Sequence, residues 1–174
     1  MIISAEIINQ PISGEYQEIR YDCDCELRSN DWTWIRFTNN DYSEWCGSFP
    51  GFPINVEISD KNETILVMTY AALFQLDKSS GKVLNKELNS GYIQLTLSPS
   101  GEYILATPDK IDRVKGDIRT KVSIDSPIKM DFIEFRNWNN GKLTFICDEF
   151  LAWDRHFEME LDPTDWTLKI INAI

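Results

Sequence analysis

The fold is decided by a stretch that reads Phe132-Ile-Glu-Phe135, then Asn139-Asn-Gly141, then Lys142-Leu-Thr-Phe-Ile146. Two runs of alternating β-forming residues flank an Asn-Gly pair. This pair favours a tight hairpin turn, because both residues tolerate a positive φ. The stretch therefore predicts two antiparallel strands joined by a short turn.

Four more segments repeat this pattern, with turns rich in Gly, Asn, Asp or Pro at residues 60–62, 77–81, 98–101 and 162–165. Five hairpins in succession predict an antiparallel meander. We therefore expect an all-β fold, arranged as a sandwich or as part of a propeller, in a single globular domain of residues 1–174. One or two short helices are expected at 148–155 and 70–73. Residues 108–127 are expected to form a loop and one edge strand.

Two of the predicted hairpins resemble segments of β-propeller blades. Leu97-Ser-Pro-Ser-Gly-Glu-Tyr-Ile-Leu-Ala106 is similar to the blade hairpin in which a Ser-Pro-x-Gly turn precedes an aromatic and aliphatic strand. Leu73-Phe-Gln-Leu-Asp-Lys-Ser-Ser-Gly-Lys-Val-Leu84 is similar to a hairpin of quinoprotein-type blades. Ordinary meanders use the same turns, so the resemblance implies β structure and does not imply a closed ring.

The charge of the chain is strongly negative and unevenly distributed. The 174 residues carry 28 acidic and 17 basic side chains, a formal net charge of −11. Residues 1–60 alone hold 11 of the acidic and 3 of the basic side chains. Nucleic acid and anionic lipid both require a basic surface, so we expect no direct nucleic-acid binding and no membrane binding. The charge favours a basic protein as the partner.

Residues 21–28 read as a strand with two different faces, because side chains alternate along a strand. The apolar face contains Tyr21, Cys23, Cys25 and Leu27, and the opposite face contains Asp22, Asp24, Glu26 and Arg28. Cysteine on the apolar face behaves as a small buried hydrophobe. The row of three carboxylates is either a solvated face or a surface that attracts a basic protein.

A dense aromatic segment follows, and acidic residues are interleaved with its rings. Such rings are either core residues or the anchors of a protein interface, and they also suit stacking on sugars. We predict a partner-binding surface that combines these residues with the acidic row. Its members are Asp22, Asp24, Glu26, Asp31, Trp32, Trp34, Asp41, Glu44 and Trp45.

Signatures of catalysis and of metal binding are weak. His156 is the only histidine, no serine lies in a G-x-S-x-G motif, and no glycine-rich phosphate loop occurs. Cys23 and Cys25 are one residue apart, whereas zinc sites use C-x₂₋₄-C pairs. We therefore expect no metal, no cofactor and reduced thiols, with Cys46 and Cys147 in or near the core. The many carboxylates leave a hydrolase open as a third hypothesis.

The chain as a whole resembles the immunity proteins of bacterial toxin systems, which are small, acidic, single-domain proteins without catalytic signatures. The resemblance implies a cytoplasmic, non-enzymatic inhibitor that binds a basic toxin domain, such as a nuclease. Carboxylates would occupy the phosphate positions of the toxin active site and pair with its basic side chains. The alternative is a carbohydrate- or peptide-binding β module that uses exposed tryptophans.

Overall fold

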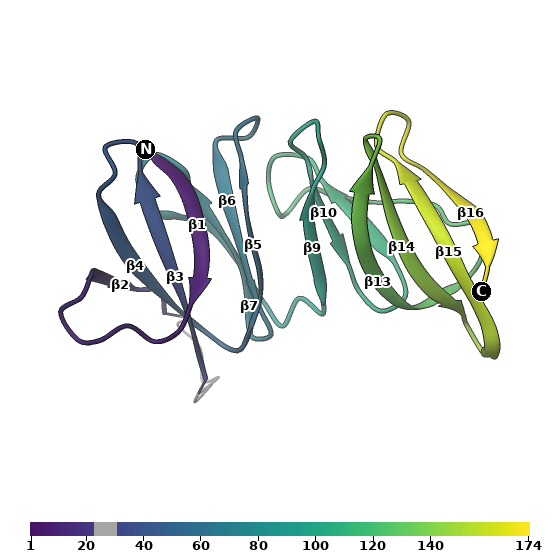
Figure 1. The fold of residues 1–174 in the computed structure, drawn as a ribbon, viewed down its shortest axis with the longest axis horizontal. Helices are drawn as coiled ribbons and strands as arrows, with labels where there is room; N and C mark the ends of the chain where they lie inside the picture. The colour runs from purple at the N-terminus through teal and green to yellow at the C-terminus, as the bar shows by residue number, and fades with distance from the viewer. Residues whose placement is uncertain (23–30) are drawn as a thin grey trace. The chain divides into compact units, whose positions relative to one another are not determined.

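The computed structural model describes residues 1–22 and 31–174, which form sixteen β-strands in four four-stranded sheets (Figure 1). These residues divide into two compact units, Met1–Gly91 and Tyr92–Ile174, with two sheets in each. The all-β prediction is confirmed. The described residues contain no helix, so the expectation of short helices is wrong. The single domain expected from the sequence stays a prediction.

The N-terminal unit contains one sheet of unusual order and one simple meander. The first sheet has the order β1-β3-β4-β2, and β2 pairs parallel with β4 while the other pairs are antiparallel. The second sheet has the order β5-β6-β7-β8 and is antiparallel throughout. The strands are β1 (Ile2–Ile8), β2 (Gln17–Arg20), β3 (Trp32–Asn39), β4 (Glu44–Pro50), β5 (Pro53–Ser59), β6 (Thr64–Thr69), β7 (Ala72–Asp77) and β8 (Val83–Leu88).

The C-terminal unit consists of two antiparallel meanders, with the orders β12-β11-β10-β9 and β13-β14-β15-β16. Their strands are β9 (Gln94–Leu97), β10 (Tyr103–Ala106), β11 (Ile111–Val114), β12 (Lys121–Ser123), β13 (Met130–Asn139), β14 (Lys142–Glu149), β15 (Ala152–Asp162) and β16 (Thr167–Ala173). All five predicted hairpins are present, as β5–β6, β7–β8, β9–β10, β13–β14 and β15–β16. Residues 108–127 contain two strands, β11 and β12, instead of the one expected.

The Asn-Gly turn behaves as its sequence predicts. Asn140 has φ 49° and Gly141 has φ 80°, which is the left-handed backbone that a two-residue hairpin turn requires. The flanking residues Asn139 and Lys142 pair directly across the hairpin. The two segments expected to be helical instead contain connections between neighbouring strands. Residues 148–155 contain the end of β14, a turn and the start of β15, and residues 70–71 connect β6 to β7.

The core of the N-terminal unit is built around stacked aromatic rings. Tyr21 stacks on Phe49 with ring centroids 4.3 Å apart, and Phe37 stacks on Trp45 at the same separation. The Phe49 ring also meets the edge of Phe74 at 5.3 Å. A Cβ atom at Gly47 would lie 2.8 Å from the Phe49 ring and 2.9 Å from the Phe37 ring. Glycine at this position therefore lets the rings lie directly against the backbone of β4.

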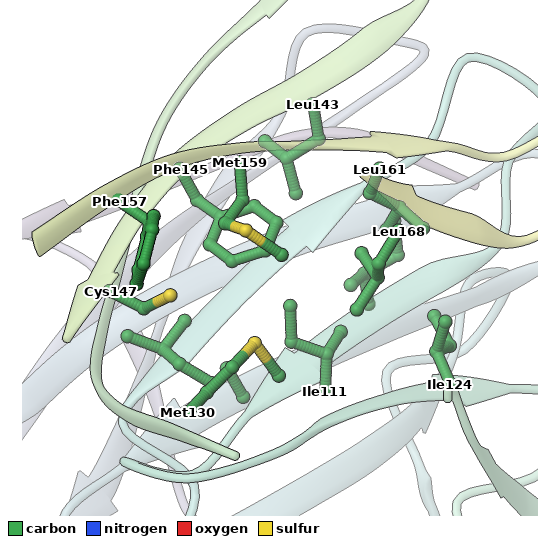
Figure 2. Packing of buried hydrophobic residues seen from close by; sticks show 13 residues of the cluster. Ile111, Ile124, Met130, Leu143, Phe145, Cys147, Phe157, Met159, Leu161 and Leu168 are labelled. Carbon is green, nitrogen blue, oxygen red and sulfur yellow. The ribbon is translucent and has the colours of Figure 1, made fainter. Parts of the chain in front are cut away.

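The core of the C-terminal unit contains apolar side chains from both of its sheets (Figure 2). Figure 2 shows Ile111, Met130 and Phe145 in this cluster, together with the thiol of Cys147. Along β14, Leu143, Phe145 and Cys147 are buried while the residues between them are half-buried. This alternation follows from the pleat of the strand, which directs successive side chains to opposite faces.

One buried carboxylate, Asp112, lies within the C-terminal unit and is only 3% exposed. It accepts a hydrogen bond from the hydroxyl of Tyr92 at 2.5 Å and pairs with the Lys110 ammonium at 3.0 Å. Burial raises the pKa of Asp112, but these donors lower it by more, so the pKa lies below its ordinary value. The carboxylate is thus held ionised by its partners.

Replacing Asp112 by asparagine is expected to lower the free energy of unfolding at pH 7 by about 1–3 kcal/mol. A lowered folded-state pKa stabilises the fold above the unfolded pKa, near 3.8, and this contribution is lost as the pH falls through the folded value. The difference between the two proteins should therefore shrink below about pH 4. Urea unfolding at pH 7 and at lower pH measures it. Asp125→Asn, at an exposed position, is the matched control, and an equal loss there would contradict the assignment.

Candidate protein-binding surface

The two faces of the first sheet differ sharply in composition. Along β3, Thr33, Ile35 and Phe37 are buried, so the side chains between them lie on the opposite face. That face also receives residues from β1, β2 and β4, because side chains at paired positions share a face. We call it the tryptophan face and define it by Glu6, Ile8, Arg20, Trp32, Trp34, Arg36 and Glu44.

Trp32 and Trp34 are the largest side chains of the tryptophan face, and both are half-buried. They lie two residues apart on β3, so both occupy the same side of the strand. The guanidinium carbon of Arg20 lies 4.2 Å from the centroid of a Trp32 ring, which is cation–π geometry. Ile8 of β1 pairs with Trp34 across the sheet and extends the apolar area.

The charges of the tryptophan face are organised around Arg36. Its guanidinium forms an ion pair with Glu6 from β1 and lies 3.7 Å from the Glu44 carboxylate of β4. A hydrogen bond with Tyr16 raises the pKa of Arg36, and the contacts with Glu6 and Glu44 raise it further. Arg36 is therefore already compensated from two sides, and with Arg20 the charges that define the face balance. The excess of negative charge lies at its border, at Asp22 and Asp31.

The remaining predicted site residues lie in several places. Asp22 is exposed and lies 3.8 Å from Arg20, which joins it to the tryptophan face. Asp31 is exposed and directly precedes β3. Asp41 lies in the β3–β4 turn, where the hydroxyl and backbone amide of Ser43 donate to its carboxylate. These hydrogen bonds lower the pKa of Asp41. Asp24 and Glu26 lie outside the described residues, as does most of the strand predicted for 21–28.

Trp45 is not on the tryptophan face, and this corrects the sequence prediction. It is 9% exposed and belongs to the buried core. The cause is the strand register, because Trp45 pairs with Phe37, whose side chain points into the core. Conversely, the structure adds Glu6, Arg20 and Arg36, which the sequence prediction missed. The alternation of β3 is a signal that could have found Arg36, since Arg36 follows Trp32 and Trp34 at the same spacing.

His156 and the two described thiols are the groups to consider for catalysis. The imidazole Nδ1 of His156 lies 2.6 Å from the Asp148 carboxylate, as a base and its orienting acid do in hydrolases. Within residues 1–22 and 31–174, no cluster of three or more His, Cys, Asp or Glu side chains is placed to hold a metal. Cys46 and Cys147 are buried free thiols. Burial raises the pKa of both and brings that of Cys147 to about 11, so both thiols are poor nucleophiles at neutral pH.

Comparisons with known proteins do not assign a family. No family model matches the chain, and no curated protein matches it. In the described part of the chain, no helix is long and apolar enough to cross a membrane.

Solved structures with some backbone similarity come from unrelated proteins. One is a chain from the S. cerevisiae complex of Dbp5 with Nup159 and Gle1, with a TM-score of 0.47, 10% identity, and coverage of 71% of this chain and 34% of that chain. Another is dihydro-heme d1 dehydrogenase NirN, with a TM-score of 0.45, 12% identity, and coverage of 82% and 43%. A third is a Bacteroides caccae protein of unknown function, with a TM-score of 0.40, 12% identity, and coverage of 95% and 63%. The chain spans less than two thirds of each, and no function is transferred from them.

Proposed function

We propose that this chain is a non-enzymatic binding protein whose tryptophan face docks on a basic protein. The observation that carries the proposal is the pair of half-buried tryptophans on one strand face, bordered by carboxylates of β1 and β4 and of the residue Asp22 after β2. The partner proposed is a basic toxin domain, such as a nuclease, which the chain would block as a cytoplasmic immunity or inhibitor protein.

The two kinds of side chain on the tryptophan face have separate roles in this proposal. Interface energy concentrates in a few aromatic and arginine anchors that lose their water on binding. Trp32 and Trp34 are placed to act as such anchors, because the sheet already holds them rigidly in half-buried positions. The exposed carboxylates at Asp22 and Asp31 lie at the border, where charges mainly speed the encounter with an oppositely charged partner.

A carbohydrate-binding module is the second candidate, because neighbouring tryptophans on one face of a sheet also suit stacking on sugar rings. The position of Arg20 argues against it. Its guanidinium already lies over a Trp32 ring at 4.2 Å, so a sugar would have to displace a cation from that ring. A protein surface can instead pack on Trp34 and the adjacent Ile8 while Arg20 stays over Trp32.

The salt dependence of association tests the electrostatic part of the proposal. The partner is first isolated from the native host, identified by mass spectrometry and prepared in pure form, and association is then followed by stopped flow. Raising the ionic strength from about 0.01 M to about 0.15 M shortens the Debye length from about 30 Å to about 8 Å. We expect the association rate to fall by about tenfold or more while the dissociation rate changes little. An association rate that does not depend on salt would contradict the electrostatic part of the proposal.

The inhibitory part of the proposal needs a separate measurement. The purified partner is assayed for its own activity, for example nuclease activity, with and without one equivalent of the chain. Loss of activity on binding supports an immunity or inhibitor role. Full activity in the saturated complex would contradict inhibition while leaving the docking surface intact.

A further inference from the structure

A second candidate site lies on the C-terminal unit, where β13, β14 and β15 meet the β14–β15 turn. A cavity of about 50 Å³ is lined there by Asp131, Phe132, Asp148, Glu149, Leu151 and Ala152. We call it the Phe132 cavity. Phe132 is 65% exposed and Leu151 is 78% exposed. Single exposed apolar residues are common, but two large ones at one cavity are typical of an interaction site.

The backbone holds both apolar side chains in this exposed position. Phe132 has φ 50° inside β13, where the pairing with β14 shifts register between Asp131 and Glu134. Leu151 has φ 64° in the β14–β15 turn. A left-handed backbone is unfavourable for such bulky residues. Asn140 and Gly141, in a turn of the same sheet, also have positive φ angles, and residues of their types adopt this conformation more easily. The preference of the backbone therefore does not explain why Phe132 and Leu151 occupy these two positions.

The polar lining of the Phe132 cavity has an excess of negative charge. Asp131 and Asp148 are directly opposite each other on β13 and β14, a position in which like charges repel. Asp148 is hydrogen-bonded to the His156 ring at 2.6 Å, and Glu149 forms an ion pair with Arg155 at 2.5 Å. Asp131 accepts a hydrogen bond from the backbone amide of Phe132 at 3.0 Å, and it has no ion-pair partner among the residues that the structure describes. A cation bound at Asp131 would offset the repulsion between the Asp131 and Asp148 carboxylates.

We propose that the Phe132 cavity binds an arginine or lysine side chain from an exposed segment of a partner protein. The aliphatic stem of the side chain packs on Phe132 and Leu151, and its charged group meets the carboxylates of Asp131 and Asp148. Arginine is the better fit, because its planar guanidinium can serve two acceptors at once. The cavity, at about 50 Å³, is small, so the ligand proposed for it is the end of a single side chain. This site goes beyond the tryptophan face, which belongs to the other unit.

A short peptide tests the proposal directly on the full chain. The probe is acetyl-Gly-Leu-Arg-Leu-Gly-amide, titrated into ¹⁵N-labelled protein while amide chemical shifts are recorded. We expect saturable shifts at Phe132, Leu151 and their neighbours. The same peptide with citrulline in place of arginine keeps the shape but loses the charge, and it should bind at least fivefold more weakly. Equal binding of the two peptides, or shifts confined to other regions, would overturn the proposal.

Two variants separate binding from folding. Phe132→Gly removes the ring and suits the positive φ, so it should raise the thermal midpoint while weakening the arginine peptide at least fivefold. Asp131→Asn keeps the shape of the side chain and removes its charge, and it should weaken the peptide by a similar factor. Phe52→Ala, at an exposed phenylalanine of the other unit, is the control and should leave the affinity unchanged. Unchanged affinity in both Phe132→Gly and Asp131→Asn would overturn the proposal.

The outcome is independent of the tryptophan face. The variant Trp34→Ala should bind the arginine peptide as the wild type does, because Trp34 belongs to the N-terminal unit. Failure of the peptide to bind would overturn the Phe132 cavity alone and would leave the proposed docking of the tryptophan face unaffected.

Discussion

Replacing Phe49 by alanine is expected to lower the free energy of unfolding of the N-terminal unit by about 3–5 kcal/mol. The side chain is fully buried, and its ring contacts Tyr21, Phe37 and Phe74. Truncation would leave a cavity at the centre of this aromatic cluster, and the neighbouring rings are large and rigid, so they would fill it only in part. Urea unfolding followed by tryptophan fluorescence measures the loss, because Trp45 lies in the same core.

Phe52→Ala provides the matched control for this core substitution. It removes the same atoms from the same unit, but Phe52 is 58% exposed, so the expected change is within about 0.5 kcal/mol. A comparable loss in both variants would mean that the aromatic cluster is not the centre of the core. The C-terminal unit has a separate core, and its own unfolding should be unaffected if the two units unfold independently.

The largest effect on binding is expected from Trp34→Ala, which should weaken the complex with the basic partner by at least about 2 kcal/mol, about thirtyfold in Kd. Trp34 is half-buried between Ile8 and the Ser48 position of β4, so its ring is held in place before the partner arrives. An anchor that is already ordered loses little conformational entropy on binding. Titration calorimetry with the purified partner measures the change.

A second tryptophan offers a close control for this experiment. Trp166 of the C-terminal unit is also half-buried, and an arginine, Arg113, lies 4.7 Å from its ring. Trp166→Ala therefore removes the same kind of half-buried side chain from the other unit, and it should leave the affinity unchanged. Circular dichroism spectra of both variants establish that they are folded. Equal losses of affinity in the two variants would contradict the proposal that the tryptophan face binds the partner.

The hairpins could be predicted because their information is local. A turn such as Asn140-Gly141 sets the backbone, and the alternating runs on either side set the faces. The first sheet could not be predicted in this way. Its order brings β2 beside β4 although β3 lies between them in the chain, and no local pattern encodes a contact of that kind.

The candidate site was predicted in part for the same reason. The aromatic and acidic composition of residues 31–45 is visible in the sequence, and Trp32, Trp34 and Glu44 do share one face. The position of Trp45 depends on how β3 and β4 pair across the turn at Tyr42, which has φ 63°. A shift of one residue in that pairing would exchange the faces of the strand. The partners from β1 and β2 are non-local, and only the folded sheet identifies them.

The parallel pairing of β2 with β4 imposes an order on folding. β2 precedes β3 in the chain but hydrogen-bonds to a strand that is synthesised later, so we expect the local β3–β4 hairpin to form before β2 joins its edge. We then expect β2 to be the last strand added to this sheet and, as a short and exposed outer strand, the first to be released from it. The thiol of Cys46 is fully buried and lies in register with Glu18 of β2. The rate at which a thiol reagent modifies Cys46 would therefore report how often this edge of the sheet opens.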